Sequence, residues 1–312
     1  MLLINHYSRV PSFTALLFTF STVGKINSVI KKLTLSKFLD HISTASYSIN
    51  MMRDIEVITS LKKDPMSVVP PVQSKSVDYR KKNTKGMPER FLFECAIKLG
   101  LKPLTSATAA ILFHRFIRET DETQYDPYTI ASSCLYLAGK IKDDPVKIRD
   151  VINVAHSTIN RSAQPLELGD EYWSMRDSIV QAELFITRIL KFDLTTVHPH
   201  KYMLHYMKSL QDWFGVKEWN SLPVAKTAAS FLQDFHHSAK ILDHKPDHIA
   251  VCCLALAFQA YGVQVPLTDE IDEVNAWYNV FCKDLTRDKH WEIIEDIIET
   301  YNTEGEIDED DE

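Results

Sequence analysis

From Met87 onward, apolar residues recur at intervals of three and four, the spacing that places side chains on one face of an α-helix. The pattern predicts five helices: one that ends at Gly100, one that follows a cap at Thr105 or Ser106, and three over 127–140, 146–159 and 171–190. No Asn-Gly or Asp-Gly turn and no sustained alternation of apolar and polar residues interrupts them. This part of the chain is therefore expected to be all-α.

The segment KFDLTTVHPH breaks the helical pattern, and a second run of the same kind follows it. It predicts five more helices, over 202–214, 224–237, 249–261, 275–285 and 291–301. Two runs with the same number of helices indicate two tandem five-helix domains, over 88–196 and 197–302. Residue identity between the two runs is slight, so the predicted repeat is one of architecture.

The two ends of the chain differ from the helical body in charge. Residues 1–87 hold 13 Lys or Arg and 5 Asp or Glu, whereas seven of the last nine residues are acidic. We expect a basic, disordered N-terminal extension over 1–87, whose apolar run 13–24 could instead be a targeting segment. The acidic residues predict a disordered tail over 303–312. The body between them is net acidic, which is unlike a surface that binds nucleic acid.

Composition removes several classes of enzyme. The eight glycines all stand alone, so no glycine-rich loop for a nucleotide phosphate can be assembled. The five cysteines form no C-x-x-C pair and lie in apolar surroundings, which is typical of reduced core cysteines in an intracellular protein. No run of 18 apolar residues is present, so we expect no membrane-spanning helix.

Two charged residues lie on otherwise apolar helix faces. Glu183 falls between Ile179 and Ile186 in one stripe, and Lys140 follows Leu137 at the end of another. Lys and Glu are almost never fully buried unless they are paired. They could pair with each other or keep their charged ends in water; alternatively, they could mark the rim of an apolar surface that another protein covers.

Candidate metal and catalytic groups are weak in this sequence. His244 and His248 are separated by Pro246 and have no evident third ligand, and the pairs His198/His200 and His236-His237 are similarly weak. No Ser-His-Asp or Cys-His arrangement has supporting context. We therefore expect no catalytic, cofactor or metal site.

The strings DPYTIASSCLYLAGKIKDD and RDSIVQAELFITRILKFDL resemble the third to fifth helices of a cyclin box, and the resemblance to the cyclin family covers about 88–302. It implies two cyclin boxes, of which the first binds a kinase. It also implies that the chain is not catalytic, needs no cofactor and activates a cyclin-dependent kinase, most closely cyclin-dependent kinase ten. Such a protein is expected in the nucleus, the cytoplasm or both.

The resemblance also implies which residues contact the kinase. Lys140 and Glu183 match the lysine and glutamate that bind the kinase backbone near its αC helix. The matching apolar contact positions are Leu137, Ile141, Phe192 and Leu194. The alternative is a cyclin-box transcription factor of the TFIIB-like kind, which binds DNA and acts without a kinase.

Overall fold

We describe the protein from a computed structural model, which covers residues 78–80, 86–120, 124–161, 166–266 and 276–309. These residues fall within one compact unit, Ser46–Glu312. Their regular elements are all helices, with no strand in the described part of the chain. The expectation of an all-α fold is confirmed.

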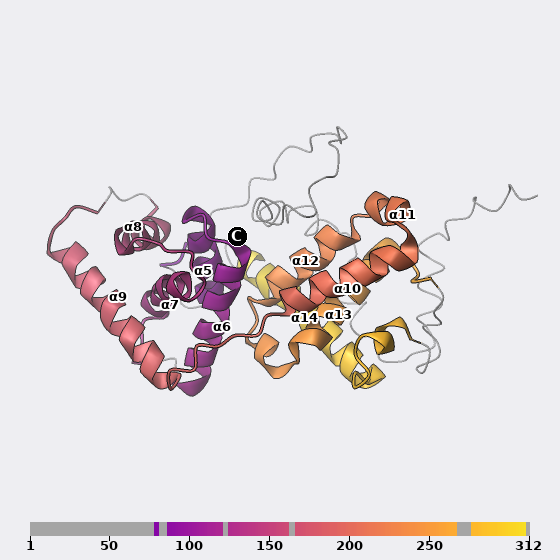
Figure 1. Cartoon of the computed structure of the whole chain (residues 1–312). Coiled ribbons are helices and arrows are strands. Elements are labelled where there is room, and N and C mark those ends of the chain that lie inside the picture. The colour runs from indigo at the N-terminus through magenta and orange to yellow at the C-terminus, as the bar shows by residue number, and fades with distance from the viewer. Residues whose placement is uncertain (1–77, 81–85, 121–123, 162–165, 267–275, 310–312) are drawn as a thin grey trace, which may run out of the picture. The chain divides into compact units, whose positions relative to one another are not determined.

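The first five helices follow the predicted pattern closely and surround a central member, α7. They are α5 (Met87–Lys98), α6 (Pro103–Glu119), α7 (Pro127–Ile141), α8 (Ile148–Ile159) and α9 (Asp170–Ile189) (Figure 1). α7 packs against the other four. The Asp126 carboxylate starts α7 by accepting a hydrogen bond from the backbone N–H of Thr129, at 2.9 Å. The largest fully buried side chains of this half include Phe91, Phe116, Leu135 and Ile186.

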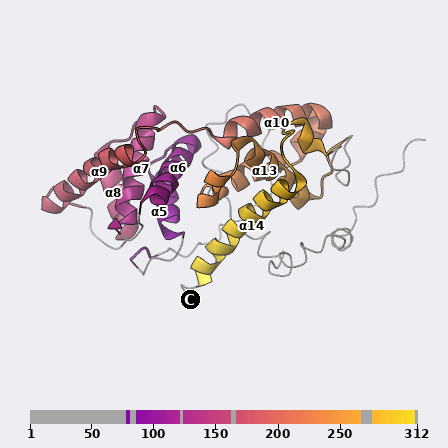
Figure 2. The ribbon, with the colours of Figure 1, turned by 90° about the horizontal axis from the view of Figure 1, so that it is seen from below.

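The second half surrounds another apolar helix, α13. It consists of α10 (Pro199–Phe214), α11 (Val216–Ser221), α12 (Val224–Phe235), the 3₁₀ turn η4 (Ala239–Asp243), α13 (Pro246–Tyr261), the 3₁₀ turn η5 (Trp277–Val280) and α14 (Arg287–Glu309). α13 packs against α10, α12 and α14. Figure 2 shows α14 as one continuous helix that leads to the C-terminal end.

Three sequence predictions in this half need correction. The expected helix over 275–285 is only the short turn η5, in which Trp277 and Tyr278 are buried. The short helix α11 was not predicted; it buries Trp219. The expected disordered tail over 303–312 is helical as far as Glu309, since glutamate is a good helix former.

Part of the expected N-terminal extension packs against the first half. Tyr79 is 3% exposed, and its hydroxyl donates a hydrogen bond to Glu94 Oε2 at 2.7 Å. Its ring meets that of Phe91 edge to face, with centroids 5.5 Å apart. Apart from 78–80 and 86–87, the extension over 1–87 lies outside the described residues.

The two halves meet along α6. His114 Nε2 donates a hydrogen bond to the backbone carbonyl of His236 at 2.9 Å, and both residues are buried. Arg118 forms an ion pair with Asp243 at 3.0 Å. The contact therefore combines buried hydrogen bonds with ion pairs nearer to solvent.

Candidate protein-interaction surface on α7 and α9

The two charged residues on apolar stripes lie side by side. α9 packs across α7, and Lys140 Nζ lies 2.6 Å from Glu183 Oε1 and 2.9 Å from Oε2. The ammonium group also lies 4.1 Å from the centre of the Tyr136 ring. Of the alternatives left open by the sequence, mutual pairing is the one that the structure shows.

The pair remains partly open to solvent. The Lys140 side chain is 48% exposed and that of Glu183 is 15% exposed. Burial acts to lower the pKa of Lys140, but the hydrogen bonds and charge of Glu183 together raise it, so the lysine stays charged. Half-exposed ion pairs contribute little to stability, so a partner can replace this one at small cost.

The four expected apolar contact residues fall into different environments. Leu137 is 5% exposed and belongs to the core of the first half, whereas Ile141 and Leu194 are partly buried against that core. Phe192 is 73% exposed. Only Phe192 therefore presents most of its ring to solvent. Leu184, beside Glu183 in the sequence, is also exposed, and the stripe pattern gave no indication of it.

A strained turn holds Phe192 outward. After α9, Lys191 and Phe192 have φ values of 53° and 60°, in the left-handed region that bulky residues rarely adopt. The N–H of Phe192 donates to the Thr187 carbonyl and that of Lys191 to the Arg188 carbonyl, both at 2.9 Å. These two bonds form a Schellman motif. An aromatic ring is thus displayed by a fixed backbone rather than by a free loop.

The backbone that follows Lys140 is also fixed. Asp144 accepts hydrogen bonds from the backbone N–H of Lys102 and the hydroxyl of Thr105, both at 2.9 Å, and so caps the start of α6. A Cβ on Gly139 would lie 2.9 Å from both the Asp144 carbonyl and the Val146 side chain. Only glycine lets this turn approach α7 so closely.

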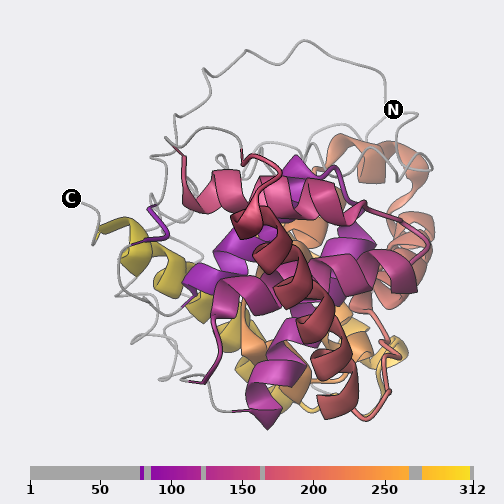
Figure 3. The ribbon, with the colours of Figure 1, turned by 90° about the vertical axis from the view of Figure 1, so that its left-hand side faces the viewer.

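In Figure 3, α9 is the element nearest the viewer, and none of the other described helices covers its outer side. Among the described elements, the second half contacts the first half through α6, not through α9. The α7–α9 surface, which we define as Lys140, Glu183, Leu184 and Phe192, thus combines a charge pair with exposed apolar side chains. Such a combination is typical of protein interaction sites.

The cysteines offer no reactive centre. All five are free and buried. Burial raises the pKa of Cys95 to about 12 and that of Cys282 to about 11, which keeps both as thiols at neutral pH. Among the described helices, none combines the length and apolar character needed to cross a membrane.

Comparison with known proteins identifies proteins that are similar to this chain. The family described as "Cyclin, N-terminal domain" matches residues 48–195, a match that begins within the expected extension. Human Cyclin-K is 29% identical over 213 residues, which are 68% of this chain and 35% of that protein. Human Cyclin-L1 is 32% identical over 174 residues, 54% of this chain and 32% of that protein. The chain thus spans about a third of the length of these two relatives.

Two solved structures share the fold. A chain of the yeast RNA Pol II CTD kinase CTDK-1 complex superposes with a TM-score of 0.57 and 21% identity, covering 74% of this chain and 69% of that one. A chain of the CAK complex of Chaetomium thermophilum gives a TM-score of 0.51 and 17% identity, covering 84% and 74%. At these identities, the likeness concerns the fold.

Proposed function

We propose that this chain is a member of the cyclin family and acts as a non-catalytic regulatory subunit that binds and activates a cyclin-dependent kinase. The observation that carries the proposal is the α7–α9 surface, where the Lys140–Glu183 pair is partly open to solvent and Leu184 and Phe192 are exposed. The relatives named Cyclin-K and Cyclin-L1 and the two kinase complexes support a kinase as the partner.

The surface suits a partner that must be held in one orientation. Kinase catalysis requires the lysine of strand β3 and the glutamate of αC to be paired. A rigid cyclin surface that binds only the inward position of αC shifts the kinase toward its active state. On binding, Lys140 and Glu183 would break their mutual ion pair and form hydrogen bonds to backbone groups near αC instead. Phe192 would supply apolar contact from its fixed turn.

We further propose the domain roles and the specific kinase. The box over 88–196 would contact the kinase, and the box over 197–302 would support it. The strings YLAGK, PLELGDEYW and HPHKYMLHYMKSLQDW resemble cyclin Q, also called cyclin M, which favours cyclin-dependent kinase ten as the partner. The relation to transcription-associated cyclins favours the nucleus as the location.

The test is co-purification of the full chain with cyclin-dependent kinase ten and with a second cyclin-dependent kinase for comparison, followed by a kinase assay. Lys140→Ala, Glu183→Ala and Phe192→Ala should each weaken binding roughly tenfold or more, as contact residues at an interface centre do. Lys217→Ala and Leu204→Ala are matched controls, because both residues are exposed on the second half. The interface is assigned wrongly if all three variants bind and activate like the wild type.

A further inference from the structure

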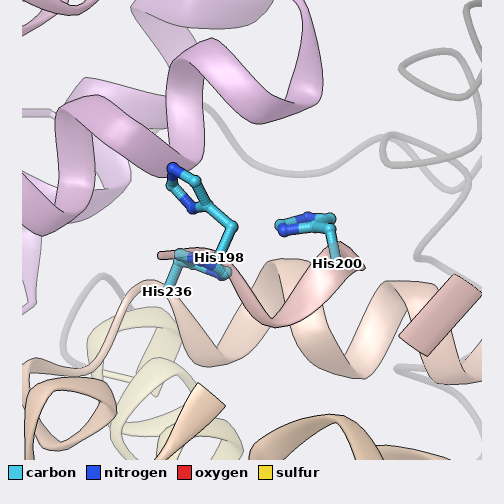
Figure 4. Close-up of side chains that lie close together, drawn as sticks. All are labelled: His198, His200 and His236. Atoms are coloured by element: carbon cyan, nitrogen blue, oxygen red, sulfur yellow. The ribbon is translucent and has the colours of Figure 1, made fainter. Parts of the chain in front are cut away.

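Three histidines from separate parts of the sequence converge where the second half meets α6. His198 precedes α10, His200 lies in its first turn, and His236 follows α12 (Figure 4). One ring nitrogen of each lies within 4.8 Å of the corresponding nitrogens of the other two. His198 and His236 are buried, and His200 is partly buried.

Each of the three rings has a buried nitrogen to which no described group of the protein bonds: Nδ1 of His198, Nδ1 of His200 and Nε2 of His236. This is unusual, because buried polar atoms nearly always have a hydrogen-bond partner. Three such atoms within one histidine cluster indicate a missing ligand. A ligand that accepts three nitrogen lone pairs at once is a metal ion.

The surroundings of His236 leave its unpartnered nitrogen as a lone pair. Nδ1 lies 2.7 Å from the backbone carbonyl of Leu232, which can only accept, so Nδ1 carries the proton. Nε2 of the neutral ring is therefore unprotonated. A hydrogen bond from the other ring nitrogen to a carbonyl is the usual means of orienting a metal-binding histidine.

The surroundings of His198 lead to the same result. The Thr108 hydroxyl donates to the Leu104 carbonyl at 2.6 Å, so it accepts from His198 Nε2, which lies 3.0 Å away. Nε2 also lies 3.0 Å from the Thr196 hydroxyl. With the proton on Nε2, the lone pair is on Nδ1, the atom without a partner.

Two other buried histidines of the second half, His244 and His248, are arranged differently. Nε2 of His244 lies 2.7 Å from Asp296, and Nε2 of His248 lies 3.1 Å from Asp284. These nitrogens are occupied by carboxylates, whereas no acidic side chain contacts the ring nitrogens of the three-histidine cluster in the described residues. Burial lowers the pKa of His198 to about 3 and that of His200 to about 4, which keeps both in the neutral form that binds metal.

We propose that His198, His200 and His236 bind a Zn²⁺ ion, which fastens the start of α10 to the end of α12. Three histidines and one open position are a donor set that zinc prefers. Zn–N bonds of about 2.1 Å require nitrogens roughly 3.4 Å apart, so nitrogens that lie up to 4.8 Å apart must close by at most about 1.4 Å through side-chain rotation. The three residues form no short metal-binding motif in the sequence, so no metal site was expected from it.

The experiment uses the full chain, expressed without a histidine tag, stripped with a chelator and then titrated with ZnCl₂ in a calorimeter. We expect one Zn²⁺ per chain. His200→Gln and His236→Gln should each weaken binding at least tenfold, since each removes a ligand. His205→Gln is the matched control, because His205 is exposed on the same helix as His200, and it should bind like the wild type.

Two further measurements keep the test decisive if a variant fails to fold. Saturating Zn²⁺ should raise the Tm of the wild type by roughly 5 °C or more, and this gain should be absent in a folded ligand variant. Co²⁺ bound to the wild type should show the visible bands of a tetrahedral site with nitrogen ligands. No stoichiometric binding, a thiolate-to-cobalt band, or folded His200→Gln and His236→Gln variants that bind like the wild type would each overturn the proposal.

Discussion

The central helices of the two halves, α7 and α13, differ in how completely the chain encloses them. Both begin with a proline in the first turn and carry long apolar stretches. In α13 the eleven residues from His248 to Phe258 are all buried. In α7 the buried stretch ends at Gly139, and Lys140 emerges to meet Glu183. The second half thus encloses its central helix in its own core, whereas the first half leaves the end of α7 partly open to solvent.

The largest expected effect on stability comes from replacing one aromatic residue in each half. Phe258 is buried on α13, with its ring stacked on Phe214 at 5.5 Å and edge-on to Trp277 at 5.7 Å. Phe258→Ala should reduce the free energy of unfolding by about 3–5 kcal/mol in urea denaturation. Phe192→Ala, on the α7–α9 surface, should change it by no more than about 0.5 kcal/mol. Similar losses for both variants would contradict the difference in enclosure.

A second test uses the buried histidine of α14. His290 stacks on Tyr278 with centroids 4.7 Å apart, and burial lowers its pKa to about 4. The fold favours the neutral ring, so this stabilisation is present above the unfolded pKa and is lost as pH falls from about 6.5 toward 4. Between pH 7 and pH 5 the loss should be about 2 kcal/mol.

His290→Phe is the control, because it keeps an aromatic ring against Tyr278 and removes the titrating group. The free energy of unfolding of this variant, measured in urea at both pH values, should fall by about 2 kcal/mol less than that of the wild type. Equal losses would mean that the enclosure of the second half does not reach His290.

The sequence predicted the elements better than their contacts. The stripes of α5 to α9 are regular, so these helices were found to within a few residues. The region 275–285 was predicted wrongly because apolar residues there are frequent enough to suggest a helical stripe, although only the short turn η5 forms. Periodicity is most informative where one face of a helix is polar.

The candidate sites show the same limit. Lys140 and Glu183 were noticed because a charge on an apolar stripe is visible in the sequence, but their pairing depends on how α9 crosses α7. His198, His200 and His236 converge only because α10 starts beside the end of α12. No local spacing records that contact. The outward position of Phe192 likewise depends on a left-handed turn without glycine.

A smaller effect is expected at the start of α7. Asp126 caps this helix, whereas α13 begins after Lys245 with no side-chain cap and relies on the packing around it. Asp126→Ala should reduce the free energy of unfolding by about 1 kcal/mol, and Asp126→Asn should largely preserve it because asparagine caps equally well. Urea denaturation of both variants checks this. Equal effects of the two substitutions would show that packing, not the cap, fixes the start of α7.

The smallest effect on stability is expected from the residue pair with the largest proposed role in binding. A double-mutant cycle with Lys140→Ala and Glu183→Ala should give a coupling energy of about 0.2–1 kcal/mol for unfolding, since the lysine is half exposed. In the proposed kinase complex the same substitutions should weaken affinity roughly tenfold, because there they would remove contacts that the free chain does not make. A coupling energy above about 2 kcal/mol in the free chain would instead make the pair part of the internal structure of the first half. The end of α7 would then be closed by its own charges as firmly as α13 is closed by its neighbours, and the difference between the two halves would disappear.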